Sequence, residues 1–113
     1  MNKTASSVLD QEKPTAKYTA EQLQIVSDIF KSIAFPVRLN ILDILSREEQ
    51  MTVGQLISYT NLEGSLLSHH LSKMKQSGVL ESFRQGRFIY YKLKLKKITS
   101  IFDCIDQCNI FNQ

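Results

Sequence analysis

The chain has 113 residues, of which 42% are hydrophobic and 22% charged, and its net charge is +3. These values are ordinary for a globular protein, and the length is that of one domain, which can bury a core but has little to spare. No apolar run approaches the roughly 18 residues that a membrane span needs, and the amino terminus lacks the apolar stretch of a signal peptide. We therefore expect a cytoplasmic protein whose two cysteines are mostly reduced.

Positive charge is concentrated in residues 65–97. That stretch holds eight Lys and Arg residues against one acid, Glu81, and so carries +7, whereas the rest of the chain carries −4. Such polarity is typical of a protein that binds a polyanion. The alternative interpretation is a charged face that is only solvated.

The amino-terminal third predicts an arm followed by a helix. Residues 1–18 are polar and without periodicity, and we expect a flexible arm there. Thr19, with Gln22 three residues later, is a capping-box pattern that begins the first helix. The apolar residues of this helix are Leu23, Ile25, Val26, Ile29, Phe30 and Ile33. They spread over about 160° of its circumference, wider than the ~100° stripe that core packing uses, which predicts an additional dimer contact.

The next segments predict a helix-turn-helix. Pro36 suits a first helical turn, and the helix that follows it is apolar on nearly all sides, so we expect it at the centre of the core. Thr52 and Gln55 form a second capping-box pattern, which begins a short helix over 53–59. A turn then leads to another helix within 62–78. Two short helices joined by a few residues, the second one polar and basic, indicate a helix-turn-helix.

The second of these helices has one apolar face, formed by Leu67, Leu71 and Met74 at helical spacing. The remaining positions are polar, with no acid on the outward side. They include Ser65, Ser68, His69, Ser72, Lys73 and Gln76. Donor groups without carboxylates suit a helix that reads base edges in the major groove of DNA.

A β-hairpin is expected after this helix. Residues 79–84 alternate between two faces, and residues 87–93 are aromatic and β-branched. A Gln85–Gly86 pair is expected to form the two-residue turn. The tip carries Arg84 and Arg87, so the hairpin is expected to be a basic wing. Arginines in such a position hold phosphates and add affinity more than base specificity.

The carboxy-terminal segment over 96–109 is helical by period. Its apolar stripe consists of Ile98, Ile101, Phe102, Ile105 and Cys108. Because the preceding elements do not need another amphipathic helix for their core, we expect this stripe to pair with the first helix as a dimer interface. Residues 19–109 are thus expected to form one DNA-binding and dimerisation domain, and residues 110–113 a short tail.

Three sequence runs resemble the ArsR/SmtB-type family of bacterial winged-helix repressors, and the similarity covers about residues 20–107. The runs are AFPVRLNILDIL, LSHHLSKMKQSGVL and RQGRFIYYKL. The resemblance implies a mainly α fold with a small β-hairpin (α+β), the winged helix-turn-helix. It also implies a homodimer that binds a pseudo-palindromic double-stranded operator and releases it when an inducer is sensed. The DNA contacts carried over are Ser65, Ser68, His69 and Lys73 in the reading helix, and Arg84 and Arg87 in the wing.

Two metal sites of that family have no counterpart in this sequence. Relatives that sense metal through the helix at 53–59 typically carry a Cys-x-Cys run there, whereas this chain has no cysteine in that stretch. Relatives that sense zinc-type metals through the last helix carry histidines, and this helix has none. We therefore expect neither a metal nor a cofactor. Gly64 and Leu66 replace residues that are often polar in relatives, which leaves base contacts at those positions open.

Cys104 and Cys108 lie four residues apart on the last helix, about 40° apart around its axis. One interpretation is a thiol sensor that is oxidised, takes up sulfur or binds a soft ion. The other is a pair of small apolar residues packed at an interface. A disulfide at this spacing would strain the helix, because Cα atoms four residues apart lie near the upper end of the bridgeable range.

The two histidines are adjacent and point about 100° apart, so they cannot bind one metal ion together. We expect His69 to face DNA and His70 to be half-buried against the helix over 53–59 or the wing. No acid near either ring in the sequence orients it, and no nucleophile triad or carboxylate pair is present, so we do not expect an enzyme.

Two alternatives stay open from the sequence. The winged helix could be a protein-interaction module whose basic face contacts an acidic partner, or a DNA-binding repressor without an inducer site. DNA binding weakens steeply with salt because each neutralised phosphate releases counterions, and a protein partner of modest charge gives a shallower dependence.

Overall fold

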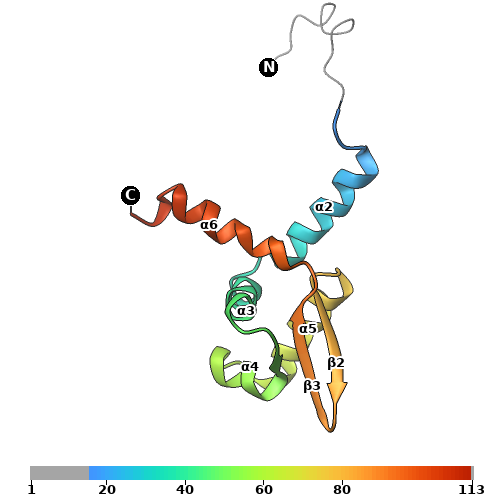
Figure 1. Cartoon of the computed structure of the whole chain (residues 1–113), viewed down its shortest axis with the longest axis vertical. Coiled ribbons are helices and arrows are strands. Elements are labelled where there is room, and N and C mark those ends of the chain that lie inside the picture. Colours follow the sequence, from blue (N-terminus) through green and yellow to red (C-terminus); the bar gives the residue numbers. More distant parts are fainter. Residues whose placement is uncertain (1–15, 113) are drawn as a thin grey trace, which may run out of the picture.

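The computed structural model describes residues 16–112, so most of the predicted arm over 1–18 lies outside the described residues. Within them the chain forms five α-helices, three strands and two 3₁₀ turns (Figure 1). The elements are α2 (Ala20–Ile33), α3 (Pro36–Arg47), β1 (Met51–Thr52), α4 (Val53–Thr60), α5 (Gly64–Gln76), β2 (Leu80–Gln85), β3 (Phe88–Leu93), η1 (Lys96–Thr99), α6 (Ser100–Gln107) and η2 (Ile110–Asn112). This is the predicted winged helix-turn-helix. No helix in the described range is long and apolar enough to cross a bilayer.

Both predicted capping boxes are present. The backbone amide of Gln22 donates to Thr19 Oγ1 at 3.0 Å, and the Thr19 amide donates to Gln22 Oε1 at 2.9 Å. The corresponding distances at Thr52 and Gln55 are 3.1 and 2.8 Å. Each box satisfies amides that the first helical turn would otherwise leave unpaired, which is why α2 and α4 begin where the sequence predicts.

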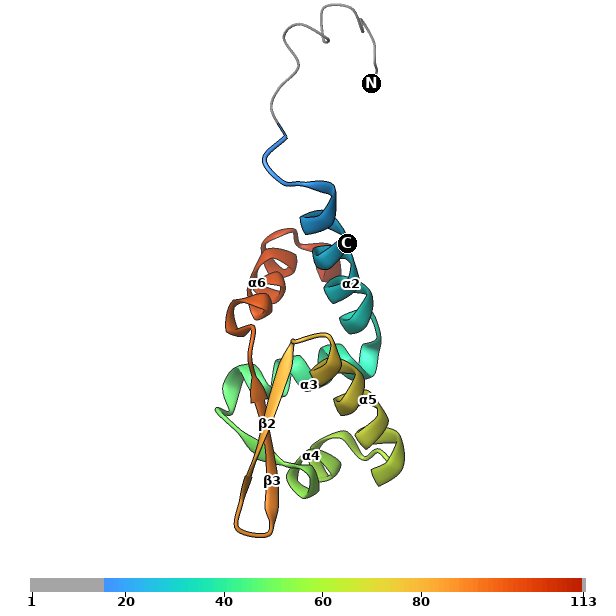
Figure 2. The same ribbon diagram turned by 90° about the vertical axis from the view of Figure 1, so that its right-hand side faces the viewer.

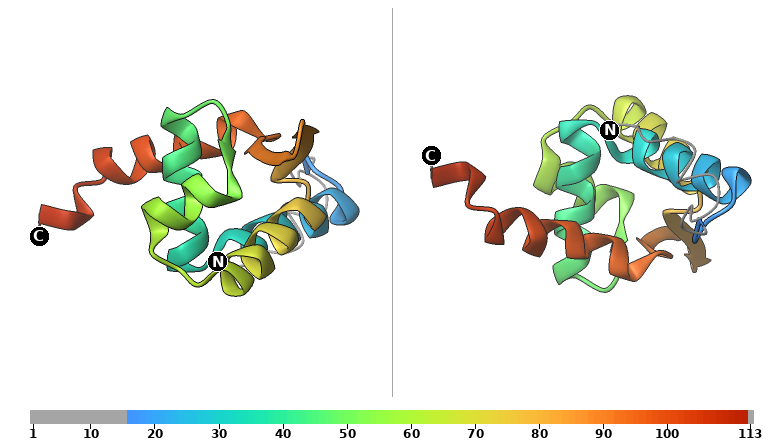
Figure 3. Two further views of the ribbon diagram at one scale, coloured as in Figure 1. Left: turned by 90° about the horizontal axis from the view of Figure 1, so that it is seen from below. Right: turned by 90° about the horizontal axis from the view of Figure 1, so that it is seen from above.

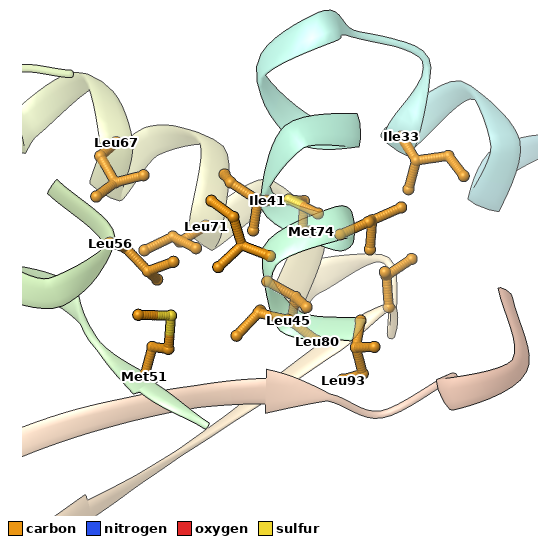
Figure 4. Packing of buried hydrophobic residues seen from close by; sticks show 13 residues of the cluster. Ile33, Ile41, Leu45, Met51, Leu56, Leu67, Leu71, Met74, Leu80 and Leu93 are labelled. Carbon is orange, nitrogen blue, oxygen red and sulfur yellow. The ribbon is translucent and has the colours of Figure 1, made fainter. Parts of the chain in front are cut away.

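α3 is the central helix of the core, as predicted, and it packs against α4, α5 and β3 (Figure 4). The buried cluster consists of Ile33, Ile41, Leu42, Ile44, Leu45, Met51, Leu56, Leu67, Leu71, Met74, Val79, Leu80 and Leu93. Burial of one such aliphatic side chain stabilises the fold by roughly 1.5–3 kcal/mol. The helix-turn-helix formed by α4 and α5 is therefore held on a rigid base.

The wing is a three-stranded antiparallel sheet rather than the expected two-stranded hairpin. β1 pairs with β3, with Met51 opposite Tyr91, and the strand order is β1–β3–β2. Two residues are too few to show the alternation by which a strand is recognised, so β1 has no signal in the sequence. The strand anchors the start of α4 to the wing and brings Met51 into the core.

The turn of the wing is one residue later than predicted. Gln85 pairs with Phe88, so the two turn residues are Gly86 and Arg87 rather than Gln85 and Gly86. Gly86 has φ +66°, a left-handed conformation that glycine adopts without strain, and a glycine at the first turn position suits a type II′ turn. Arg87 therefore lies in the turn itself, at the extreme tip of the wing.

The carboxy-terminal segment differs from the single helix expected over 96–109. It begins with the 3₁₀ turn η1 and continues as α6, which ends at Gln107. Asn109, whose φ of +59° is left-handed, separates α6 from the 3₁₀ turn η2. The expectation that the core does not need this segment was wrong, because three of its apolar residues pack against the core cluster. These are Ile98, Ile101 and Phe102.

α2 and α6 lie at the end of the molecule opposite the tip of the wing (Figures 1 and 2). They leave the body in different directions, as the views along the long axis show (Figure 3). Only Ile33 of α2 is buried, whereas Leu23, Ile25 and Phe30 are 53%, 61% and 49% exposed. The apolar surface of α2 is therefore largely uncovered in the single chain.

Candidate DNA-binding surface

α5 packs into the domain through one face only. Leu67, Leu71 and Met74 are at most 1% exposed, and the helix contacts α3, α4 and β2. The opposite face carries the exposed polar residues Ser65, Ser68, His69, Ser72, Lys73 and Gln76. The four reading-helix positions expected from the sequence thus share one solvent-exposed face, which can enter the major groove without disturbing the core.

An acid caps the amino terminus of α5, a feature that was not predicted from the sequence. Glu63 accepts hydrogen bonds from the backbone amides of Ser65 at 2.9 Å and Leu66 at 3.3 Å, and from the Ser65 hydroxyl. The Ser65 hydroxyl and amide lower the pKa of the Glu63 carboxyl below its ordinary value of 4.5. The helix therefore begins with a carboxylate, and the Ser65 hydroxyl donates to that carboxylate rather than to solvent. An acid directly before the first helical residue was the available sequence signal.

His69 and His70 have different surroundings. His69 is exposed on the polar face, as expected, and His70 is half-buried. The predicted neighbours of His70, α4 or the wing, were wrong. The ring instead contacts Arg38 of α3 and Phe35, the residue directly before α3. Arg38 Nε donates to His70 Nδ1 at 3.0 Å, and the Phe35 ring lies 6.4 Å away between centroids. Burial, and then the charges of Arg38 and His69, lower the pKa of His70 below 6.5, so the ring accepts this bond as a neutral imidazole.

The wing carries its two arginines toward solvent. Arg84 lies on β2 opposite Ile89, and the Arg87 guanidinium lies 5.4 Å from the centre of the Phe88 ring. Both side chains are exposed. Behind the tip, the rings of Phe83 and Tyr90 stack at 5.4 Å across the two strands, which stiffens the hairpin. The wing is thus a supported arm that presents two guanidinium groups.

The positive charge of residues 65–97 has no acidic partner within residues 16–112. Within the described residues the one salt bridge joins Arg47 to Asp43, outside this segment. The eight cationic side chains of the segment therefore have no carboxylate within 4.0 Å in this part of the chain. Their charge is available to an external anion, which is the condition for a steep salt dependence of binding.

Comparison with known proteins bears on this surface. A family model described as "Bacterial regulatory protein, arsR family" matches residues 36–82. The transcriptional repressor SdpR of Bacillus subtilis is 40% identical over 68 residues, which cover 60% of this chain and 74% of SdpR. The transcriptional repressor PagR of Bacillus anthracis is 34% identical over 80 residues, which cover 71% of this chain and 80% of PagR.

The chain belongs to the ArsR family. The structural match to the crystal structure of PagR covers 77% of this chain and 99% of the PagR chain, with a TM-score of 0.70 and 32% sequence identity. A homodimeric winged helix-turn-helix DNA-binding domain of Mycobacterium bovis, at 24% identity, shares the fold with a TM-score of 0.71 over 86% of this chain and 89% of its own. ArsR-family proteins are transcriptional regulators and not enzymes, and this chain is a DNA-binding transcriptional repressor.

This ArsR-family chain has two free cysteines in its last helical segment. Cys104 lies in α6, Cys108 is the residue that caps it, and the Cys108 amide donates to the Cys104 carbonyl at 3.1 Å. Both are exposed in the single chain rather than packed in its core. Among residues 16–112, no group of three or more His, Cys, Asp and Glu side chains is arranged to hold a metal ion.

Proposed function

We propose that the repressor is a cytoplasmic homodimer that binds a pseudo-palindromic double-stranded operator, with one α5 in the major groove of each half-site and each wing on the adjacent phosphates. The observation that carries the proposal is the exposed polar face of α5 on a surface with a local charge of +7 and no internal partner for its bases among the described residues. A two-fold symmetric protein reads half-sites about one helical turn apart.

The dimer interface in this proposal is formed by α2 and α6. The apolar side chains of α2 that the single chain leaves uncovered need a partner surface, since a contiguous exposed apolar patch favours association. Ile110 and Phe111, after α6, are 47% and 74% exposed and add a second apolar surface at the same end of the molecule (Figure 1). The Mycobacterium bovis domain, which is a homodimer, has the same fold, and this supports a homodimer as the assembly.

Each site residue has a role in the proposal. Ser68, His69 and Lys73 donate hydrogen bonds to base edges or nearby phosphates, since all three are exposed on one face of α5. Arg84 and Arg87 neutralise phosphates beside the groove. Ser65 contacts DNA as an acceptor, because its hydroxyl hydrogen is directed to Glu63. No cofactor takes part.

Binding to DNA is tested with a duplex from upstream of the gene and a shuffled duplex of the same composition, across a series of salt concentrations. A preference for the upstream duplex, with an affinity that falls steeply as salt rises, supports the proposal. Equal affinity for both duplexes contradicts sequence-specific recognition. A shallow salt dependence together with capture of an acidic protein would favour the interaction-module alternative.

We further propose that an inducer acts through Cys104 and Cys108. The supporting observation is that both thiols are exposed and one helical turn apart, next to the proposed dimer interface. Oxidation of the pair to a disulfide transfers two electrons and two protons to the oxidant, and the Cα spacing near the upper end of the bridgeable range would distort the end of α6. A repressor without an inducer site is the competing interpretation.

The thiol proposal is tested by measuring operator affinity for the fully reduced protein and after treatment with a polysulfide or a mild oxidant. A Cys104→Ser, Cys108→Ser double variant is the matched control. Weaker binding after treatment of the wild type alone supports a thiol switch. An unchanged affinity in both proteins means that the cysteines only occupy space at the interface.

A further inference from the structure

Ser32, at the end of α2, is hydrogen-bonded to two different parts of the domain. Its carbonyl accepts from Arg38 Nη1 at 2.8 Å, and its hydroxyl donates to Ser77 Oγ at 2.8 Å. Ser77 is the residue that caps the carboxy terminus of α5, and its own hydroxyl donates to the Met74 carbonyl at 2.9 Å. The last turn of the proposed dimerisation helix is therefore attached directly to the end of the reading helix.

Arg38 makes a second connection between the same two helices. Its guanidinium donates through Nη1 to the end of α2 and through Nε to His70, in the middle of α5. The planar fork holds both acceptors at once, and the guanidinium carbon lies 4.2 Å from the centre of the Phe35 ring. Two attachments at different points along α5 fix its direction as well as its position.

Arg38 is unusual because it is a buried cation without an acidic partner among the described residues. It is 7% exposed and is the one buried charged residue in that part of the chain, while the single salt bridge there involves other residues. Burial of a charge opposes folding, and an apolar side chain of the same volume would serve packing as well or better. A role in orienting the elements explains the guanidinium better than stability does.

We propose that Arg38 is a positioning residue for DNA recognition: with Ser32, His70 and Ser77 it forms a joint that fixes the angle between α2 and α5. The proposal rests on the dimer of the proposed function, in which that angle sets the separation of the two reading helices. An error in the angle is repeated in both subunits, so a loosened joint changes which half-site spacing fits. The joint thus contributes to specificity although none of its residues belongs to the exposed face of α5.

The joint depends on a neutral His70. Nδ1 can accept from Arg38 only while it carries no proton, and protonation would place a second cation against the guanidinium. The charged and titratable groups that act on the ring are Arg38 from α3 and the neighbouring His69 on α5, and Phe35 and Ser32 face the joint with uncharged groups. Acidification should therefore open the joint.

The direct test measures the angle without DNA. Spin labels are placed at Gln24→Cys on α2 and Gln76→Cys on α5 in a Cys104→Ser, Cys108→Ser chain, diluted with unlabelled chain so that each dimer carries one labelled subunit. We expect a narrow distance distribution in the parent and a broad or shifted one in Arg38→Met, which keeps the volume and removes the fork. Equal distributions would overturn the proposal.

The functional test compares operators that differ only in the spacing of their half-sites. The parent should prefer one spacing, and Arg38→Met should lose about tenfold of that preference while it still sediments as a dimer. If Arg38→Met does not fold, His70→Leu and His70→Gln are compared instead, since glutamine retains an acceptor for Arg38 and leucine does not. If Arg38→Met keeps the parent's preference for one half-site spacing, the proposed joint is wrong. The same holds if His70→Leu and His70→Gln keep that preference equally.

A pH series separates positioning from packing. The series is run in a His69→Gln background, so that His70 is the one histidine left in the chain. Spacing preference should decline as pH falls below about 6.5 and stay constant when His70→Gln is added. The same decline with His70→Gln would overturn the role of His70. A failure of the proposed function can be told apart from a failure of the joint. A parent protein that is monomeric, or that binds all duplexes equally, would contradict the proposed function, but the distance between the labels at positions 24 and 76 of one chain could still be measured.

Discussion

The two ends of this molecule differ in how much of their structure one chain completes. At the wing end, the apolar residues of α5 are buried under α3, α4 and β2, and its polar face is left for a ligand. At the other end, α2 buries Ile33 alone and leaves Leu23, Ile25 and Phe30 exposed. The difference indicates that the DNA-binding half is complete in one chain, and it is the reason why we propose that a second copy completes the α2 and α6 half.

The largest expected effect comes from placing a charge at the incomplete end. Phe30→Glu should give monomers by sedimentation and weaken operator binding by roughly a hundredfold, because the second half-site no longer contributes avidity. Ile101 is a poorer position, since it packs against the core cluster of its own chain. Ala20→Glu is the control, as it adds the same charge to an exposed first-turn position of α2. A Phe30→Glu dimer would remove α2 from the interface.

A smaller effect is expected at the wing. Replacing Arg84 and Arg87 together with Gln should weaken binding to every duplex by similar factors and lower the salt slope by about two, because each arginine neutralises one phosphate. Binding is measured by fluorescence anisotropy against salt concentration. Lys31→Gln, on α2, is the control, since it removes a cation away from the DNA-binding end. Weaker binding to one sequence alone would mean that the wing reads bases.

Single changes on α5 should alter preference more than affinity. Ser68→Ala or His69→Ala should reduce discrimination between operator and shuffled DNA by about 1–3 kcal/mol, because each removes a group able to pair with a base edge. Competition binding with single-base operator variants locates the position read. Gln76→Ala, at the carboxy-terminal end of the same face, is the control. Unchanged discrimination in both variants would assign base reading to another element.

The smallest effect concerns the cap of α5. The folded-state pKa of Glu63 is lowered, so its stabilisation is present above the unfolded-state pKa near 4.5 and is lost as pH falls through the lower folded-state value. Glu63→Gln should therefore be slightly less stable than the wild type at neutral pH, and the two should converge in acid. Urea unfolding midpoints between pH 3 and 7 measure this. Glu21→Gln removes an exposed first-turn carboxylate without removing a cap, and an equal effect there would contradict the assignment.

Much of the fold and of the candidate site was predictable because it is encoded locally. Two capping boxes, the apolar face of α5 and the alternation of β2 and β3 each depend on residues a few positions apart. The exposed positions Ser68, His69, Lys73, Arg84 and Arg87 followed from those periods. The turn was misplaced by one residue because glycine suits either position of a two-residue turn, and only the pairing of Gln85 with Phe88 decides between them.

By itself, the sequence determined the helices with their caps, the basic segment, the family resemblance and the surplus of apolar surface on α2. Only the tertiary structure decided the partners of short or distant elements. β1 exists because β3 lies beside it, and His70 meets Arg38, which is 32 residues away in the chain. The physical reason is that periodicity shows which face of an element is buried, while the identity of the group that meets that face depends on how the elements pack.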